Sequence, residues 1–168
     1  MQVVILAGGL GTRLKALAFD GPKALVPVNG VPFVDHQLKL LADQQCSDVL
    51  ICVGHLGDRI QSHVGDGAGH GVHVRYVCEK PDALLGTGGA LLNALPHLES
   101  EFVVMYGDSY LPMDLRQMMR WCKASGFPAV MSVFRNRGQW DKSNVRISGE
   151  KVSFYSKTAE VGECDHID

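Results

Sequence analysis

The sequence predicts an α/β fold: a mostly parallel sheet with helices on both faces. Two observations support this prediction. Short segments rich in Val, Ile and Phe alternate with longer segments of helical periodicity along 168 residues, and a glycine-rich turn follows the first short segment. Strands that alternate with helices form parallel sheets with right-handed crossovers, as in Rossmann-like proteins. The length suits one domain.

The predicted strands are short and apolar. We expect them at residues 2–6, 48–53, 72–78, 101–106 and 129–134, where β-branched and aromatic residues concentrate. Ligands of parallel sheets bind outside the carboxyl ends of the strands. The loops that follow these segments are therefore the expected location of a site.

Three predicted helices lie between the strands, each with an apolar face at helical spacing. These faces consist of Val34, Leu38, Leu41 and Ala42; of Ala90, Leu91, Ala94 and Leu95; and of Leu115, Met118, Met119 and Cys122. We expect Thr87 to cap the second helix, and Gly126 to end the third.

Composition and charge exclude several classes of protein. The chain has 16 Lys and Arg against 18 Asp and Glu, a net charge of -2, which gives no reason to expect nucleic acid or an anionic membrane as partner. Its five cysteines form no C-x-x-C pair, which indicates reduced thiols in a cytoplasmic protein rather than a zinc site. We expect neither a secretory signal nor a membrane span.

The turn after the first strand is the most informative stretch. Residues 6–14 read Leu-Ala-Gly-Gly-Leu-Gly-Thr-Arg-Leu. The glycines at 8, 9 and 11 allow backbone N–H groups to approach an anion without a side chain between them. Thr12 adds a hydroxyl donor, and Arg13 and Lys23 add two cations. Together these groups predict a site for a polyphosphate.

Two other glycine-rich loops do not fit this turn. No window matches the P-loop pattern G-x-x-x-x-G-K-[ST], and in the dinucleotide pattern G-x-G-x-x-G the third glycine is replaced by Leu14. A dinucleotide-dependent oxidoreductase is therefore disfavoured.

The turn, followed by Pro22-Lys23-Ala24-Leu25-Val26-Pro27-Val28, resembles the signature of the sugar-nucleotide pyrophosphorylases. These nucleotidyltransferases join a nucleoside triphosphate to a sugar 1-phosphate. The resemblance continues in order with Leu85-Gly86-Thr87-Gly88-Gly89-Ala90, Tyr106-Gly107-Asp108 and Tyr155-Ser156-Lys157. It therefore covers nearly the whole chain.

The resemblance implies roles for particular residues. Those expected to bind the nucleotide are Leu6, Ala7, Gly8, Gly9, Gly11, Thr12, Arg13, Lys23, Glu79, Gly86, Thr87 and Gly88. Arg13, Lys23 and Asp108 are the implied catalytic residues, with Asp108 also the ligand of Mg²⁺. Glu79 either meets the base or a ribose hydroxyl, or lies in a solvated loop. Asn144 and Lys157 are expected to reach the sugar and its phosphate. The alternative for Lys157 is that it is a solvent-exposed lysine without a role in the site.

The implied reaction is an in-line displacement, because no Ser-His or Cys-His pairing suggests a covalent intermediate. GTP with a heptose or mannose 1-phosphate is favoured by the resemblance. UTP with an amino-sugar phosphate is the first alternative, and a non-catalytic nucleotide-binding or regulatory subunit is the second.

Members of this family usually continue beyond the last matched segment, with further sugar contacts and a second acidic metal ligand. We therefore expect residues 1–168 to form a single nucleotidyltransferase domain that lacks its C-terminal segment. Loss of part of the layer that covers the sheet would expose apolar surface and favour a homo-oligomer.

Overall fold

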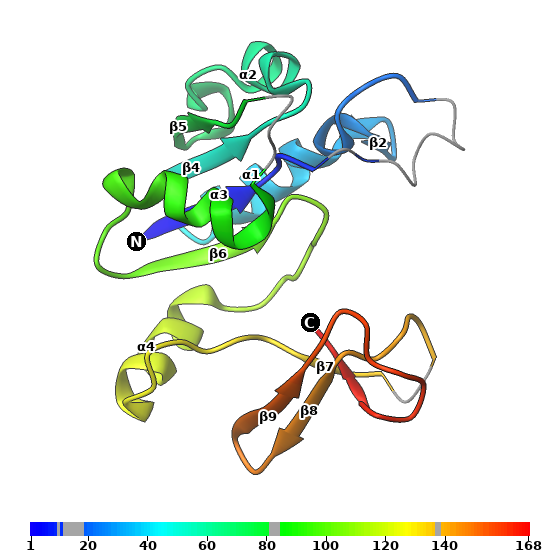
Figure 1. Cartoon of the computed structure of the whole chain (residues 1–168). Helices are drawn as coiled ribbons and strands as arrows, with labels where there is room; N and C mark the ends of the chain where they lie inside the picture. Colours follow the sequence, from blue (N-terminus) through cyan, green and yellow to red (C-terminus); the bar gives the residue numbers. More distant parts are fainter. Residues whose placement is uncertain (10, 12–18, 81–84, 137–138) are drawn as a thin grey trace. The chain divides into compact units, whose positions relative to one another are not determined.

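The computed structural model describes residues 1–9, 11, 19–80, 85–136 and 139–168. It divides into two compact units, Met1–Arg116 and Gln117–Asp168 (Figure 1). Each unit has its own main sheet. In the described part of the chain, no helix is both long and apolar enough to cross a membrane.

The sheet of the first unit is entirely parallel. It contains β1 (Gln2–Leu6), β4 (Asp48–Val53), β5 (His73–Cys78) and β6 (Phe102–Tyr106), in the order β5-β4-β1-β6. Four of the predicted strands are confirmed to within one residue at their starts. The strand β1 has partners on both sides, and its Val3, Val4 and Ile5 are fully buried because both faces of the sheet are covered.

Helices cover both faces of this sheet, as predicted (Figure 1). The connections through α1 (Phe33–Asp43) and α2 (Gly57–Val64) step from β1 to β4 and from β4 to β5. The connection through α3 (Gly86–Ala94) crosses back from β5 to β6. Because such crossovers are right-handed, α1 and α2 lie on one face and α3 on the other.

The core of the first unit forms where the helices meet the strands. Ala90 and Ala94 of α3 pack with Val4 and Leu50, whose side chains share one face of the sheet. On α1, the predicted apolar residues Val34, Leu38 and Leu41 are fully buried. Leu95, expected on the apolar face of α3, is instead 62% exposed in the short helix η4 (Leu95–His97) that follows α3.

The cap predicted for α3 is wrong. Leu85 is the N-cap and makes no side-chain capping bond, while Thr87 lies inside the first turn of the helix. The hydrogen bond at the start of the helix comes from a residue farther away in the sequence: the Glu79 carboxylate accepts the N–H of Leu85 at 2.9 Å.

Between β1 and α1, the described chain forms a short helical turn and a tight hairpin. The turn η2 (Lys23–Leu25) precedes β2 (Pro27–Val28), which pairs with β3 (Val31–Pro32). Asn29 and Gly30 join the two strands with positive φ angles of 52° and 79°, the conformation that two-residue hairpin turns require. The hairpin leads directly into α1, and the N–H of Phe33 donates to the carbonyl of Val26 at 2.9 Å.

The second unit contains a small antiparallel sheet. It is built from β7 (Phe134–Arg135), β8 (Val145–Ser148), β9 (Lys151–Tyr155) and β10 (His166–Ile167), in the order β7-β10-β8-β9. The helix α4 (Leu115–Ser125) begins at the end of the first unit, and Gly126 follows it with a positive φ of 69°, as predicted.

The strand predicted at 129–134 is wrong. Only Phe134 and Arg135 of this region form a strand, and they pair antiparallel with Ile167 and His166. A β-rich composition specifies a strand only where a neighbouring strand completes the ladder. Here the ladder with β10 is only two residues long.

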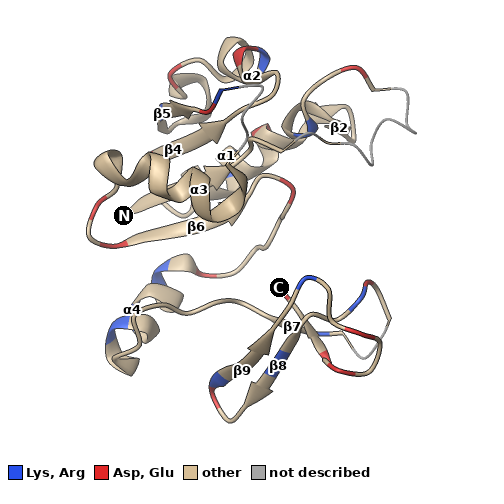
Figure 2. Cartoon of the chain, viewed as in Figure 1, with Lys and Arg blue, Asp and Glu red and all other residues tan. Residues whose placement is uncertain are grey.

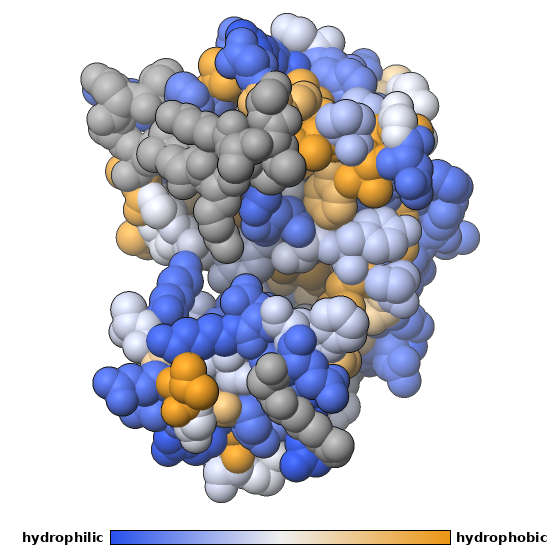
Figure 3. Space-filling model, turned by 90° about the vertical axis from the view of Figure 1, so that its right-hand side faces the viewer, coloured by the Kyte–Doolittle hydropathy of each residue, from blue (hydrophilic) through white to orange (hydrophobic). Residues whose placement is uncertain are grey.

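Acidic and basic residues are dispersed along the chain (Figure 2). Figure 2 shows acidic and basic residues interspersed along both units, in keeping with the net charge of -2. The face in Figure 3 carries apolar and hydrophilic side chains side by side. In the first unit, the edge strand β6 leaves Val104 39% and Tyr106 37% exposed.

Candidate functional site

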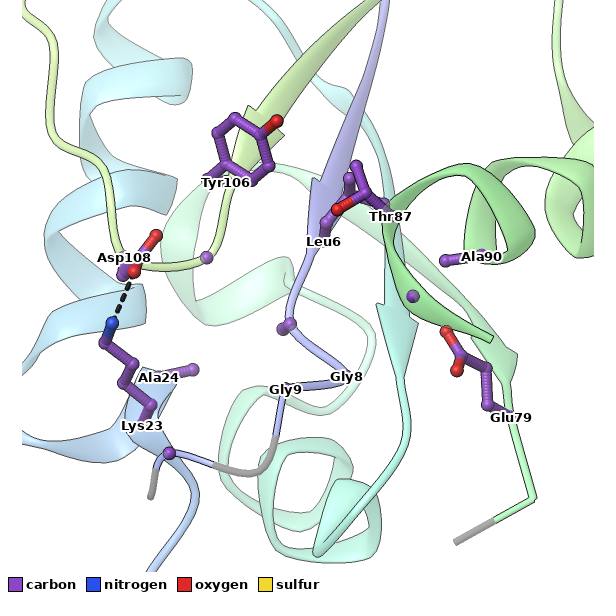
Figure 4. Close-up of a pocket in the computed structure, with 14 residues that line it drawn as sticks. Leu6, Gly8, Gly9, Lys23, Ala24, Glu79, Thr87, Ala90, Tyr106 and Asp108 are labelled. Carbon is purple, nitrogen blue, oxygen red and sulfur yellow. Dashed lines mark hydrogen bonds and ion pairs between the residues drawn. The ribbon is translucent and has the colours of Figure 1, made fainter. Parts of the chain in front are cut away.

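A cavity of about 540 Å³ opens in the first unit, at the carboxyl ends of β1 and β6 and beside the start of α3 (Figure 4). Its lining residues are Leu6, Ala7, Gly8, Gly9, Gly11, Lys23, Ala24, Glu79, Gly86, Thr87, Ala90, Tyr106, Gly107 and Asp108. This is the edge of the sheet at which parallel α/β proteins bind their ligands.

The backbone of the glycine turn forms one wall of the cavity. Ala7 fixes the start of the turn, since its N–H donates to the carbonyl of Cys52 at 2.8 Å. A Cβ on Gly8 would lie 3.3 Å from Glu79 Oε1, whereas a Cβ on Gly9 would meet nothing within 4 Å. Gly11 has a positive φ of 60°. The turn therefore offers bare backbone to the cavity, a surface suited to anion binding.

Glu79 contributes a buried carboxylate to this cavity. Only 8% of the residue is exposed, so a solvated loop does not describe it. Its own N–H donates to the carbonyl of Val53 at 2.8 Å, and its Oε2 accepts the N–H of Leu85. These two bonds fix the carboxylate beside the first turn of α3 (Figure 4).

Lys23 and Asp108 form an ion pair within the cavity (Figure 4). Lys23 comes from η2 and Asp108 from the turn after β6. Their side chains are 35% and 40% exposed, so both charges are accessible to a ligand. A phosphate could displace the carboxylate from the ammonium, and a cation could displace the ammonium from the carboxylate.

The turn that carries Asp108 is held by backbone bonds. Gly107 donates its N–H to the carbonyl of Leu6 at 2.9 Å, and Ser109 donates to the carbonyl of Tyr106 at 3.1 Å. The first of these bonds ties the end of β6 to the end of β1. The carboxylate and the glycine turn are therefore parts of one rigid edge.

The structure brings most of the expected nucleotide-binding residues together. Those that line the cavity are Leu6, Ala7, Gly8, Gly9, Gly11, Lys23, Glu79, Gly86 and Thr87, together with the expected metal ligand Asp108. Gly88 lies on α3 and does not line the cavity. Thr12 and Arg13 lie outside the described residues.

The two residues expected to bind the sugar phosphate belong to the second unit. Asn144 donates its side-chain amide to the Asp168 carboxylate, and its Oδ1 accepts the N–H of Asp168 at 3.2 Å. Tyr155 donates its hydroxyl to the other oxygen of Asp168 at 3.1 Å. Lys157 is exposed.

Four lining residues were not predicted as site residues: Ala24, Ala90, Tyr106 and Gly107. Tyr106 and Gly107 had a detectable signal, because they directly precede Asp108 at the end of a strand. Ala90 was assigned to the core face of its helix, and it is indeed buried there. Nothing in the residue type of Ala24 distinguishes it from ordinary core.

The carboxylates of the cavity suit a metal ion that is shared with a ligand. Within the described ranges, no three His, Cys, Asp or Glu side chains gather into a group that could hold a metal by themselves. Mg²⁺ commonly binds through one or two carboxylates and completes its shell with water and substrate phosphates. The accessible carboxylate of Asp108, in a cavity that also contains the Lys23 ammonium and the glycine turn, fits that arrangement.

One ionisable group behind the cavity has a shifted pKa. Burial raises the pKa of the Cys52 thiol from 9.0 to about 11, and the negative charge of Glu79 adds to the effect. Cys52 is therefore a neutral thiol of the core, and not a nucleophile that the cavity could use.

Comparison with known proteins identifies the family. The family model that describes the MobA-like NTP transferase domain matches residues 3–157. The chain belongs to this family. The match starts in β1 and extends into the second unit as far as residue 157.

Several relatives of this MobA-like domain act on sugar phosphates, according to their names. One relative is the D-glycero-alpha-D-manno-heptose 1-phosphate guanylyltransferase of Campylobacter jejuni. The chain is 36% identical to it over 118 residues, and this alignment covers 70% of the chain and 52% of the relative. Another relative is the mannose-1-phosphate guanylyltransferase of Mycobacterium tuberculosis. The chain is 29% identical to it over 136 residues, and this alignment covers 80% of the chain and 37% of the relative. The chain thus spans about half the length of such relatives, or less.

A solved structure supports the fold. HddC from Yersinia pseudotuberculosis, complexed with GMP-PN, aligns with a TM-score of 0.75 and 28% identity, over 98% of this chain and 71% of that chain. The fold of the MobA-like domain is therefore the α/β, Rossmann-like fold that the sequence predicts.

Proposed function

We propose that this protein transfers a nucleotidyl group from a nucleoside triphosphate to a sugar 1-phosphate and releases pyrophosphate. The observation that carries this proposal is the cavity itself. At one edge of a parallel sheet it combines a bare glycine backbone, the Lys23 ammonium and the Asp108 carboxylate. Relatives named as sugar-1-phosphate guanylyltransferases support it.

The reaction we infer is a direct displacement at phosphorus. An oxygen of the sugar phosphate attacks the α-phosphorus, the bond from that phosphorus to the bridging oxygen breaks, and pyrophosphate leaves with the electron pair. Such transfers depend on positioning and on stabilisation of charge. The N–H groups of Gly8 to Gly11 would hold the outer phosphates, together with Thr12 and Arg13, and Lys23 would stabilise charge on the α-phosphate.

Asp108 is the residue that we expect to hold Mg²⁺. The ion would neutralise part of the phosphate charge when bound. For this, the Asp108 carboxylate must leave the Lys23 ammonium, which frees Lys23 to face the phosphates. The ion pair is then the resting arrangement of two groups that separate when the nucleotide enters.

Guanine is the base that best suits Glu79. A carboxylate only accepts hydrogen bonds, and guanine alone among the common bases presents two adjacent donors, N1–H and the N2 amino group, on its pairing edge. The carboxylate of Glu79 is buried and fixed by Leu85, so a base without such donors would leave it poorly paired. UTP is the alternative, because some relatives are named as uridylyltransferases.

A heptose or mannose 1-phosphate is the acceptor that we propose, with Asn144 and Lys157 as its contacts. The named guanylyltransferase relatives support this choice of sugar. A cytoplasmic location and a homo-oligomeric state remain predictions.

The test is a pyrophosphate-release assay. The purified chain is assayed with each of the four common triphosphates, against a panel of heptose, mannose, glucose and N-acetylglucosamine 1-phosphates. We expect release with GTP and a heptose or mannose 1-phosphate. In the Lys23→Ala variant we expect a rate about a hundredfold lower, with the nucleotide Kd changed far less.

The outcomes separate the candidate functions. Release with UTP alone would replace guanine by uracil in the proposal. Binding of triphosphate, measured by calorimetry, without release for any pair would favour the non-catalytic nucleotide-binding subunit. No binding of any triphosphate would refute the assignment of the cavity.

A further inference from the structure

We propose that Gln37 of α1 is the positioning residue for Asp108, because its buried amide clamps the turn that carries this carboxylate. The proposal rests on the proposed function, in which Asp108 holds the metal. It assigns a catalytic effect to a residue that does not line the cavity.

The contacts of Gln37 centre on the Asp108 turn. The side chain is fully buried. Its Nε2 donates to the carbonyl oxygen of Tyr106 at 2.9 Å and to that of Ser109 at 2.7 Å. These two carbonyls flank Gly107 and Asp108 on either side, so a single amide group fixes both ends of the turn.

The orientation of this amide is determined by the same contacts. If the amide were turned over, its oxygen would face two carbonyl oxygens, which cannot donate a hydrogen bond. In the orientation observed, Gln37 Oε1 is the buried side-chain atom left without a partner among the described residues. Buried polar atoms are nearly always paired. The side chain thus keeps both bonds to the turn while its own oxygen stays unsatisfied.

The helix that carries Gln37 also supports the other member of the ion pair. Phe33, the first residue of α1, bonds to Val26, just after the η2 turn that carries Lys23. Gln37 therefore holds the turn that carries Asp108, and Lys23 holds the Asp108 carboxylate. When the nucleotide separates the ion pair, Gln37 still holds the turn, together with the backbone bonds of Gly107 and Ser109.

A second buried glutamine offers a matched control. Gln2 is also fully buried, donates its Nε2 to the carbonyl of His97 at 3.0 Å and accepts the N–H of Glu99 at 2.9 Å. It sits at the amino end of β1, whereas the cavity lies at the carboxyl end. Replacing either glutamine with methionine removes the hydrogen bonds of a buried side-chain amide and keeps a similar side-chain volume. Only Gln37 contacts the turn that carries Asp108.

The experiment compares Gln37→Met with Gln2→Met in the full chain. Three quantities are measured: the thermal midpoint, amide hydrogen exchange in the segment 106–109, and the Mg²⁺ concentration that gives half the maximal rate. We expect both variants to lose thermal stability. Only Gln37→Met should speed exchange at Gly107 and Ser109 and raise the half-saturating Mg²⁺ concentration by roughly tenfold, with the KM for GTP nearly unchanged.

A second variant covers a failure of the first to fold. Gln37→Leu is apolar, favours helix and removes both donor N–H groups, so it should show the same faster exchange and the same higher Mg²⁺ requirement. Equal exchange and equal Mg²⁺ dependence in the Gln37 and Gln2 variants would overturn the proposal. If the wild-type chain transfers no nucleotide, the proposed function fails, and the exchange comparison still decides whether Gln37 clamps the turn.

Discussion

The N–H of Gly107 donates to the carbonyl oxygen of Leu6 at 2.9 Å, and a Cβ on Gly107 would lie 2.7 Å from that same oxygen. The added atom would also lie 3.1 Å from the Cα of Ala7. Both neighbours belong to the backbone and cannot rotate away as a side chain could. The ends of β1 and β6 therefore approach each other as closely as they do because residue 107 has no side chain.

Gly107→Ala should force these two strand ends apart. Overpacking a tight contact costs about 1–3 kcal/mol, so we expect a lower thermal midpoint together with a large loss of nucleotide binding. Thermal denaturation and calorimetric titration with GTP measure the two effects. Gly69→Ala is the control, because a Cβ there meets nothing within 4 Å. If Gly107→Ala bound GTP as the wild type does, the rigid edge described above would be wrong.

Asp108→Asn should abolish most turnover and leave the fold intact. The variant keeps the shape of the side chain but loses the charge that would hold the metal, and a loss of a hundredfold or more in rate is expected. The ion pair with Lys23 is 35% and 40% exposed, and such pairs contribute at most about 1 kcal/mol. The thermal midpoint should therefore change little. Wild-type turnover in this variant would remove Asp108 from the mechanism.

Glu79→Gln should weaken the preference for GTP over UTP. The oxygen of the glutamine still accepts the N–H of Leu85. Its amide nitrogen is a donor, however, and therefore cannot accept a hydrogen bond from guanine. Loss of a hydrogen bond to a charged group corresponds to roughly tenfold or more in relative affinity. Competition of unlabelled GTP and UTP against a fluorescent nucleotide measures the ratio. An unchanged ratio would place the base elsewhere.

The Cys52 thiol should make the fold sensitive to alkali. In the unfolded chain this thiol ionises near 9.0, whereas in the fold its pKa is about 11. The raised pKa favours the neutral form in the fold, so stability is complete below pH 9 and falls as the pH rises to 11. At pH 10 the loss is roughly 1 kcal/mol. Urea denaturation at pH 8 and pH 10 measures this loss of unfolding free energy. Between the two pH values, the Cys52→Ala variant should lose less stability than the wild type, by about the same amount. Equal losses in the two proteins would contradict the shifted pKa.

The sequence predicted the parallel sheet well because its two central strands, β1 and β4, are buried on both faces. Continuous apolar runs such as Val49–Val53 leave little choice of structure. The eight-residue α2 was not located from its pattern, since only Gly57, Ile60 and Val64 are buried along it. The region 129–134 has equally β-rich residues, but whether it forms a strand depends on a partner that is distant in sequence.

The same distinction applies to the site. The glycine turn, Lys23 and Asp108 could be placed at one edge from strand order alone, because each follows a parallel strand or lies in the loop after it. The burial of Glu79 could not, since the polar run Glu79-Lys80 reads as surface. Gln37 was equally hidden, because a glutamine next to Leu38 on a helix gives no sign that it faces inward. Its contacts lie 69 and 72 residues away.

The central position of β1 has a consequence for the order of folding. This strand pairs with β4 on one side and with β6 on the other, in registers that join Gln2 to Asp48 and to Phe102. During synthesis, β1 emerges before both of its neighbours, and it must therefore wait for β6 until about a hundred further residues have emerged. The glycine turn is synthesised before β6, but it becomes half of a binding site only when β6 pairs with β1.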